Sequence, residues 1–371
     1  MNDEITRRLV ELTRDLIIIP STVNHPRDID RGIEFVRNHL EETPNLNIQS
    51  FKPNGVPSLL ATPKGINHPQ ILLAAHLDIV NLPEETIFTS KIENGQIHGT
   101  GSADMKGPLA ILLEIFRKTH AENPDASLGI VVTTDEERGG EHGIKYLVEE
   151  EGMRCGLAII PDSGSINSVT VEEKGILHIK ITSRGEAGHA SRPWLADNAL
   201  QRLMDNLSRV RAFFDGMQKN ARNWHPTISV NIVHTENDAF NRIPEEAIAQ
   251  CDIRFTKPWT AARLLERIKD ELDENTEAES IISAESCHFA PDPHFLKVTQ
   301  EVTGKKVELH HAHGGSDARF LSAHGIPVLM SRPICGNVHS IDEWIDIESM
   351  TQLYHIYDRY LQHKFNTSSG N

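Results

Sequence analysis

The stretch ILLAAHLDIV, residues 71–80, decides the fold. Its first five residues are apolar, which is typical of a strand that is buried on both faces of a sheet. His76 and Asp78 follow directly, although polar groups are costly to bury unless they have partners. We therefore expect this strand to end at a site that supplies those partners.

Three further segments, 128–133, 157–160 and 326–331, have the same apolar character as the opening stretch. Between the predicted strands lie helical patterns such as 107–119, whose leucines recur on one face. Strands that alternate with helices and are continuously apolar predict an α/β fold. We expect a mostly parallel sheet with helices on both of its faces.

The pattern changes after residue 174. Strands such as 176–183 and 227–234 alternate polar and apolar residues, as half-exposed antiparallel strands do. The predicted elements then follow in the order β-α-β-β-α-β, which is that of a ferredoxin-like α+β sandwich. We therefore predict one domain in two parts, residues 1–174 and 290–371, with a second domain inserted over residues 175–289.

Composition excludes several classes of function. The chain has 371 residues and a formal charge of −16, which disfavours binding to nucleic acid. No apolar run approaches the roughly 20 residues of a membrane span, and the N-terminal stretch resembles an amphipathic helix, not a signal peptide. The four cysteines form no CxxC pair, so we expect a protein of the reducing cytoplasm. Because no membrane span is predicted, we also expect that the protein does not act at a membrane.

Histidines and carboxylates follow four predicted strands and precede one helix, at the edge where open parallel sheets bind ligands. These residues are His76, Asp78, Asp104, Asp135, Glu136, Glu137, Asp162 and His339. A set of ligands drawn from these residues, with two histidines and three carboxylates, would suit a pair of divalent cations such as Zn²⁺, Mn²⁺ or Co²⁺. Without cations, so many acids at one edge would repel each other.

Each of these features has a simpler explanation when taken alone. A histidine at a strand end is commonly a satisfied core or surface residue, and the DEE run at 135–137 is typical of a solvated turn. Asp104 suits a helix N-cap, and Asp162 suits a turn. Their convergence on one sheet edge favours the metal site, because independent surface residues rarely converge.

Six motifs together resemble the M20 family of co-catalytic metallopeptidases, which includes acetylornithine deacetylase, succinyl-diaminopimelate desuccinylase, aminoacylase and glutamate carboxypeptidase. The motifs are HLD at 76–78, GTGSADMKG at 99–107, DEERGG at 135–140, PDSG at 161–164, GHAS at 188–191 and GNVHS at 336–340. The resemblance covers nearly the whole chain. It implies a zinc-peptidase-like catalytic domain and an inserted lid and dimerisation domain, through which a homodimer forms.

The resemblance also implies two divalent metal ions, with Zn²⁺ favoured and Co²⁺ or Mn²⁺ accepted. The implied ligands are His76, Asp104, Glu137, Asp162 and His339. Asp104 would bridge the two ions, and Asp78 would hydrogen-bond the far ring nitrogen of His76. Glu136 would be the general base that activates a bridging water.

Further positions match residues that contact the substrate in this family. They are His189, Asn241, Arg254, Gly315, Asp317 and Arg319. His189 would stabilise the oxyanion, from its own or the partner subunit. Simpler explanations stay open: a surface histidine, an exposed strand arginine for Arg254, and a helix cap for Asp317. The stretch TENDAFN before Arg242 also departs from the glycines usual in the family.

The stretch HHAHGGSDARF at 310–320 could form a separate metal site through its histidines, but its match to the family's GGSDAR substrate loop disfavours that site.

The residue type at Asp162 bears on the substrate. The family's deacylases and carboxypeptidases usually have glutamate there, whereas its aminopeptidases and dipeptidases have aspartate. We therefore expect cleavage of short peptides, with deacylation of N-acyl amino acids, of the acetylornithine deacetylase or desuccinylase type, as the alternative. A non-catalytic binding protein is disfavoured because all ligand positions and Glu136 carry competent residues. A nucleotide-binding Rossmann enzyme is disfavoured because HGTGSADMKG lacks a full GxGxxG.

Overall fold

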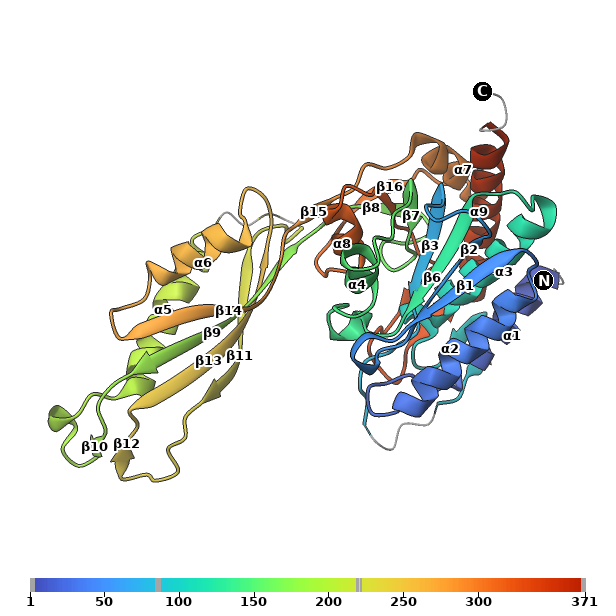
Figure 1. Ribbon diagram of the computed structural model, residues 1–371. Helices are drawn as coiled ribbons and strands as arrows, with labels where there is room; N and C mark the ends of the chain where they lie inside the picture. The colour runs from blue at the N-terminus through green and yellow to red at the C-terminus, as the bar shows by residue number, and fades with distance from the viewer. Residues whose placement is uncertain (1–3, 84–87, 218–219, 221, 368–371) are drawn as a thin grey trace. The chain divides into compact units, whose positions relative to one another are not determined.

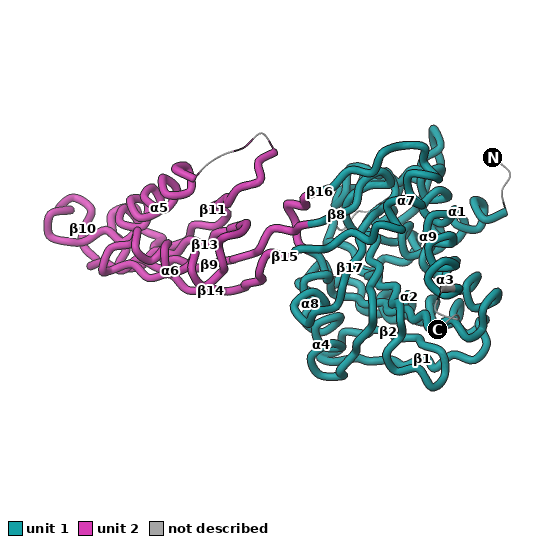
Figure 2. The backbone as a smooth tube through the Cα atoms, turned by 90° about the horizontal axis from the view of Figure 1, so that it is seen from above, with its two compact units in different colours: residues 1–171, 288–310, 316–371 teal, residues 172–287, 311–315 magenta. Residues whose placement is uncertain are grey.

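The computed structural model describes residues 4–83, 88–217, 220 and 222–367. The chain divides into two compact units, shown in two colours in Figure 2. Unit 1 contains residues 1–171, 288–310 and 316–371, and unit 2 contains residues 172–287 and 311–315. The chain therefore passes between the units four times.

The central sheet of unit 1 has six strands in the order β1-β2-β6-β3-β7-β17 (Figure 1). The strands are β1 (Leu46–Phe51), β2 (Ser58–Pro63), β3 (Ile71–His76), β6 (Leu128–Thr133), β7 (Leu157–Ile159) and β17 (Val328–Leu329). The four strands from β6 to β17 are parallel, while β2 runs antiparallel to β6 and β1 antiparallel to β2. The predicted mostly parallel sheet is therefore confirmed, with an antiparallel strand near one edge.

Helices cover both faces of this sheet. They are α1 (Glu4–Ile17), α2 (Pro26–Glu41), α3 (Gly107–Glu122), α4 (Ile144–Glu149), α7 (Pro293–Thr303), α8 (Ala318–Ala323) and α9 (Ile347–Thr367). All six residues of β3 are buried. Ile71, Leu73 and Ala75 join the core that α1, α3 and α9 share, so Leu72 and Ala74 point to the opposite face. This burial on two faces explains the continuous apolar run in the sequence.

Two smaller sheets complete the first unit and its connections. One has the order β18-β19-β5-β4 and joins β18 (Cys335–Gly336) and β19 (Trp344–Asp346) to β5 (Gln96–His98) and β4 (Lys91–Glu93). The other has the order β15-β8-β16, and its strands β8 (Ser168–Glu173), β15 (Cys287–His288) and β16 (Glu308–Ala312) contain three of the four passages between units. The first of these sheets brings residues 344–346 beside residues 96–98.

Unit 2 consists of an antiparallel sheet with two helices. Its main elements are β9 (Gly175–Arg184), α5 (Ala199–Asp215), β11 (Thr227–His234), β13 (Glu246–Phe255), α6 (Ala261–Lys269) and β14 (Thr276–Ala284). Their order along the chain is β-α-β-β-α-β, and the sheet order is β11-β13-β9-β14. Alternate residues of β9 and β13 form a core with α5 and α6. The side chains of Asn198 and Thr260 cap the two helices.

Within the described residues, no helix is long and apolar enough to span a membrane.

Candidate metal centre

His76 ends β3, and both of its ring nitrogens face oxygen atoms. Nδ1 lies 3.0 Å from the backbone oxygen of Asp78, and Nε2 lies 3.0 Å from Oδ1 of Asp104. Because a carbonyl oxygen can only accept, Nδ1 carries a proton, and Nε2 is the nitrogen that faces Asp104. Burial favours the neutral ring, but the contacts with Asp104 and Asp78 raise the pKa of His76 well above its usual range. The pair Nε2–Oδ1 therefore favours a positive charge between its two atoms, which a divalent cation would also supply.

Asp104 lies between two histidines. It belongs to the irregular turn Ser102–Lys106, directly before α3. Its Oδ1 faces His76, and its Oδ2 lies 3.2 Å from Nε2 of His339. Burial alone would raise the pKa of Asp104, but the contacts with His339 and His76 hold it well below its usual range. A carboxylate with one oxygen toward each histidine has the form of a bridging ligand.

His339 also contacts Glu137, whose Oε1 lies 3.2 Å from its Nε2. The residue has a positive φ of 65° in the loop between β18 and β19, and its side chain is half exposed. Hydrogen bonds with Asp104 and Glu137 raise the pKa of His339 to about 10. One imidazole thus shares two carboxylates, as a ligand at a cation site does.

Three of the predicted ligands satisfy a geometric test for a metal site. One ligand atom each from His76, Asp104 and Glu137 lies within 4.8 Å of the others, and among the described residues no other such group of three is found. A histidine nitrogen with two carboxylate oxygens is a donor set that Zn²⁺, Mn²⁺ and Co²⁺ accept. The residues present therefore fit a divalent cation, and His339 lies against two of the three.

Asp162 lies outside that group of three. It follows β7 and is partly buried, and its backbone oxygen accepts a hydrogen bond of 3.3 Å from Arg332. Its negative charge contributes to the raised pKa of Glu136.

Glu136 and Glu137 form a short turn, Glu136–Arg138, after β6. Burial raises the pKa of Glu136 well above its usual range, and the charges of Asp162, Asp317 and Glu137 raise it further against the opposing effect of His76. Glu136 is therefore a strong proton acceptor by the standards of a carboxylate. Of these two glutamates, only Glu137 is found in contact with His339 among the described residues.

The carboxylate of Asp78 does not make the hydrogen bond to His76 that the sequence suggested. Its Oδ1 lies 3.5 Å from Nδ1 of His76, beyond a normal hydrogen bond, and the shorter contact comes from its backbone oxygen. Its Oδ2 instead accepts a hydrogen bond of 3.1 Å from the backbone N–H of Glu137. Asp78 therefore orients His76 mainly through its carbonyl group, and its carboxylate positions the turn that carries Glu137.

Asp317 and Arg319 support the same turn from α8. Arg319 donates a hydrogen bond of 2.8 Å to the backbone oxygen of Gly139. Asp317 stands at the N-cap position of α8, but its side chain makes no capping bond to that helix. Its carboxylate is buried near Thr133, whose hydroxyl lies 3.4 Å away, and burial together with the charge of Asp135 raises the pKa of Asp317 to about 7. The helix-cap explanation for Asp317 is therefore wrong.

Sequence reasoning missed two buried charged residues beside the site. The carboxylate of Glu343 accepts backbone hydrogen bonds from the turn that contains Asp104. Lys106 is fully buried, and its Nζ donates a hydrogen bond of 2.7 Å to the backbone oxygen of Ile19. Glu343 stands in a polar stretch that looks like a surface loop, and only the pairing of β19 with β5 brings it under the turn.

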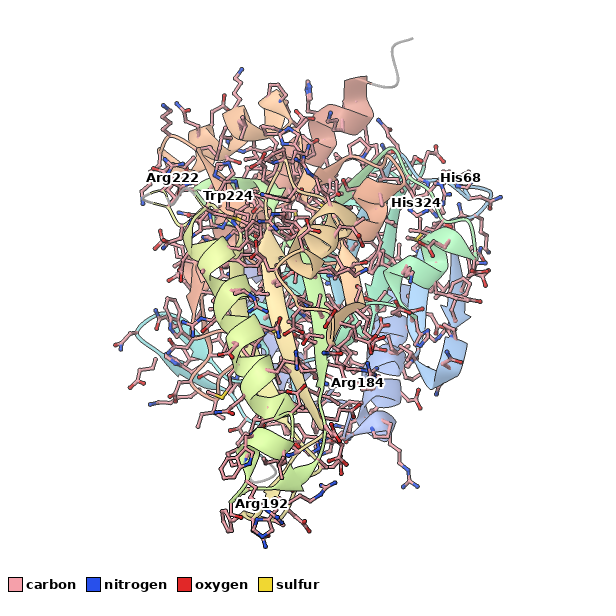
Figure 3. All side chains as sticks on the ribbon, turned by 90° about the vertical axis from the view of Figure 1, so that its left-hand side faces the viewer. His68, Arg184, Arg192, Arg222, Trp224 and His324 are labelled. Atoms are coloured by element: carbon pink, nitrogen blue, oxygen red, sulfur yellow. The ribbon has the colours of Figure 1, made fainter. Side chains whose placement is uncertain are left out.

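Unit 2 holds two predicted residues together at one of its ends. His189 lies in β10 (Gly188–His189), which pairs with β12 (Arg242–Ile243), and the backbone oxygen of Asn241 accepts from Ala190. The backbone N–H of Ser191 donates to Nδ1 of His189 at 3.1 Å. Nδ1 is therefore an acceptor, and the neutral ring carries its proton on Nε2. Figure 3 labels Arg192 at this end of the unit.

Arg254 lies far from that end of unit 2. It stands eight residues beyond Glu246 along β13, a span of about 27 Å in a strand. Its Nε and one Nη bind both carboxylate oxygens of Asp252, at 2.8 and 3.0 Å. The guanidinium that was expected to hold a substrate carboxylate is therefore already paired with an acid of the same strand.

The histidine-rich stretch leading to Gly315 packs on an aromatic ring. His311 stacks on Trp224 with ring centroids 4.9 Å apart, and His313 approaches the same ring edge-on. Neither histidine belongs to a metal-ligating group of three among the residues described. Trp224 lies at the end of unit 2 opposite Arg192 (Figure 3). Gly315 is the last residue of this stretch within unit 2, and Ser316 returns the chain to unit 1.

Comparisons with known proteins agree with this geometry. The model of peptidase family M20/M25/M40 matches residues 72–363. A relative from Marinobacter nauticus, a succinyl-diaminopimelate desuccinylase, is 29% identical over 320 residues, which make up 80% of this chain and 84% of the relative. The family match confirms the resemblance predicted from the six motifs.

Solved structures show the same fold. A tripeptidase from Staphylococcus aureus is 20% identical and has a TM-score of 0.79, over 96% of this chain and 99% of that chain. A dinuclear metal-binding peptidase of the M20 family from Bacillus subtilis is 15% identical and has a TM-score of 0.67, over 98% of this chain and 99% of that chain. These likenesses confirm the predicted α/β fold class.

Proposed function

Because this chain belongs to peptidase family M20/M25/M40 and is therefore a metal-dependent amide hydrolase, we propose that it cleaves short peptides with two bound divalent cations. The observation that carries the proposal is Asp104, whose two carboxylate oxygens face His76 and His339 at 3.0 and 3.2 Å. In the proposal Asp104 would bind both cations, His76 and Asp162 would complete the ligands of one cation, and His339 and Glu137 would complete the ligands of the other. The name of the Bacillus subtilis relative, a dinuclear metal-binding peptidase, supports two ions.

The cations, when bound, would polarise the scissile carbonyl and lower the pKa of the attacking water. Zn²⁺ is the ion we favour, and Co²⁺ or Mn²⁺ would also be accepted, because imidazole and carboxylate donors suit all three. The chain's own task is to hold two imidazoles and three carboxylates at fixed positions around them. Asp78 contributes by orienting His76 and by holding the backbone of Glu137.

Glu136 is the general base in this proposal. Its carboxylate would take a proton from the attacking water and then pass it to the nitrogen of the leaving amine. Burial and neighbouring acids raise the pKa of Glu136, which makes it a better proton acceptor than an ordinary carboxylate. Adjacent residues in a turn point in different directions, so Glu137 can bind a cation while Glu136 faces the water.

His189 would stabilise the oxyanion that forms on the scissile carbonyl. The hydrogen bond from Ser191 to its Nδ1 supports this role, because it leaves the proton on Nε2, where it can be donated. Asn241, beside it in unit 2, and Gly315, Asp317 and Arg319 would shape the substrate site. Arg254 would have to leave Asp252, or use its remaining Nη, to bind a substrate carboxylate.

We extend the proposal to the domains and the assembly. Residues 175–289 would form the lid and dimerisation domain of a homodimer, and residues 1–174 and 290–371 the catalytic domain. His189 would serve its own or the partner's active site. All four cysteines lie in the described residues and none of them forms a disulfide bond, which supports a location in the reducing cytoplasm.

The substrate class depends on Asp162. Aspartate at this position supports an aminopeptidase or dipeptidase, and the similarity to a tripeptidase agrees with it. A second candidate is the deacylation of an N-acyl amino acid. It is favoured by the 29% identity to a succinyl-diaminopimelate desuccinylase. Both reactions hydrolyse one amide bond, so the same residues would serve either.

A substrate panel on protein reconstituted with Zn²⁺, Co²⁺ or Mn²⁺ tests the proposal. The panel contains dipeptides, tripeptides with a free amine, N-acetyl amino acids and succinyl-diaminopimelate. We expect peptides to be cleaved fastest and Glu136→Gln to be inactive at unchanged metal content. Preference for succinyl-diaminopimelate would select the second candidate. Full activity in Glu136→Gln, or no hydrolysis of any of these amides, would refute the mechanism.

A further inference from the structure

Glu343 holds the turn that carries Asp104. Its side chain is buried, with an exposed fraction of 2%, and its Oε2 accepts a hydrogen bond of 2.8 Å from the N–H of Gly101. Its Oε1 accepts from the N–H groups of Ala103 and Asp104, at 2.6 and 2.9 Å. One carboxylate therefore satisfies three backbone donors in four consecutive residues, across about 240 residues of sequence.

The same residue closes the loop that carries His339. β18 and β19 pair through Gly336 and Trp344, so residues 337–343 form the loop between them. The backbone oxygen of Glu343 also accepts from the N–H of Gly99, at 2.9 Å. The side chain of Glu343 is thus hydrogen-bonded to the turn of Asp104, and its backbone is part of the loop that carries His339. Nothing else in the mechanism uses this buried acid.

The chemistry of these contacts requires a carboxylate. All three partners are N–H donors, and a carboxylate has acceptor sites on both oxygens for them. An amide at the same place would turn an NH₂ group toward at least one of the N–H donors, which leaves both buried groups without a partner. A shorter acid would keep the acceptors and the charge but would draw the two loops together by one methylene.

We propose that Glu343 is a positioning residue for the metal centre. By connecting the loop of Asp104 to the loop of His339, Glu343 sets the separation of these two residues. The inference rests on the proposed function, because it assumes that both residues bind cations. Asp104 and His339 lie 3.2 Å apart, so a small shift of either loop changes the distance that a shared cation must span. Glu343 itself contacts neither the cation nor the substrate in this proposal.

Equilibrium titration of the metal-free protein with Co²⁺, followed by its visible absorption, tests the proposal. The variants are Glu343→Gln, Glu343→Asp and the control Asp342→Asn, which removes one negative charge from the exposed neighbouring residue. For Glu343→Gln we expect an affinity lower by about 10–100-fold for at least one Co²⁺, with an altered absorption spectrum. Glu343→Asp should recover part of the affinity, and Asp342→Asn should match the wild type. In the fully loaded enzymes, kcat should fall in Glu343→Gln while KM stays within about twofold.

The outcomes separate this inference from the proposed function. If the wild type binds no Co²⁺ at all, the proposed metal centre is wrong. If the wild type binds Co²⁺ and Glu343→Gln binds it with the same affinity and spectrum, only the positioning role is wrong. Should Glu343→Gln fail to fold when the metal-free variants are melted, Glu343→Asp decides the matter. Its affinity and kcat must lie below those of the wild type, and equality with the wild type would overturn the proposal.

Discussion

Replacing Asp78 by asparagine gives a quantitative test of how the metal centre is held. The carboxylate accepts a hydrogen bond of 3.1 Å from the N–H of Glu137 and lies 3.5 Å from Nδ1 of His76. The stronger support of His76 is the backbone oxygen of Asp78 at 3.0 Å, which the substitution keeps. The variant should therefore keep the Nδ1–H tautomer of His76. It should lose the negative charge of the carboxylate and the hydrogen bond that this charge strengthens with the N–H of Glu137.

The magnitude follows from these contacts. Loss of an outer partner of a metal-binding histidine typically weakens metal binding by about 10–100-fold. Since the carbonyl contact persists, we expect the lower end, about tenfold, which corresponds to about 1.4 kcal/mol. The metal-free protein should unfold at a temperature close to that of the wild type. Removal of the negative charge relieves its repulsion with Asp135 and Asp317, but it also removes the attraction to His76 and weakens the hydrogen bond from Glu137.

The assay is competition for Zn²⁺ with a chromophoric chelator, combined with thermal unfolding of the metal-free protein. The control is Asp125→Asn, which removes an exposed acid from the loop before β6, away from the strand ends that carry the site. An unchanged Zn²⁺ affinity would show that the carboxylate of Asp78 plays no part. Complete loss of binding would show that the carbonyl contact does not hold the tautomer, and either result would refute the reasoning.

Four further predictions concern other parts of the molecule. Gly140→Ala should lower both stability and kcat, because the φ of Gly140 is +65° and the new Cβ would lie 2.3 Å from the carboxylate of Asp317. The control is Gly139→Ala, which also has a positive φ but has open space around the new Cβ. This control should lose only about 1 kcal/mol of unfolding free energy, measured by urea unfolding. Glu114→Gln should cost about 1–3 kcal/mol of unfolding free energy with kcat unchanged, because it removes the charge of a buried carboxylate that is hydrogen-bonded to Arg8 and Arg117, both of which are partly exposed. Chelation should abolish hydrolysis but leave the circular dichroism spectrum intact, because the core needs no metal, and Zn²⁺, Co²⁺ or Mn²⁺ should restore the rate. His189→Ala should reduce kcat by about 100–1000-fold without changing metal content, whereas a tenfold or smaller loss would argue against an oxyanion role.

The fold was largely predictable because its main elements are regular. Strands buried on both faces, such as β3 and β6, are continuously apolar, and the inserted antiparallel sheet alternates. The edge strand β14 (Thr276–Ala284) is harder to delimit from the sequence. Its first residues include glutamates that point to solvent, so the apolar pattern begins late. The last predicted strand, 326–331, narrows to Val328–Leu329 because only a short parallel pairing with β7 forms.

The candidate site was predictable where chemistry follows a strand. His76, Asp104, Glu137 and His339 were expected to converge, and the structure brings them within contact distance. The supporting contacts could not be predicted in the same way. The bond from Asp78 uses a backbone oxygen, which sequence does not distinguish, and the bonds of Glu343 reach a turn about 240 residues away.

The central claim is that Asp104 bridges two cations that the hydrolysis of an amide requires. The most direct test adds Zn²⁺ in known equivalents to the metal-free protein and measures the initial rate on the best substrate of the panel. The account predicts no hydrolysis without metal, a rate that rises until two equivalents per chain are bound, and loss of stoichiometric binding in Asp104→Ala. A metal-free protein as active as the loaded one, or an Asp104→Ala variant that binds two ions and turns over normally, would contradict it.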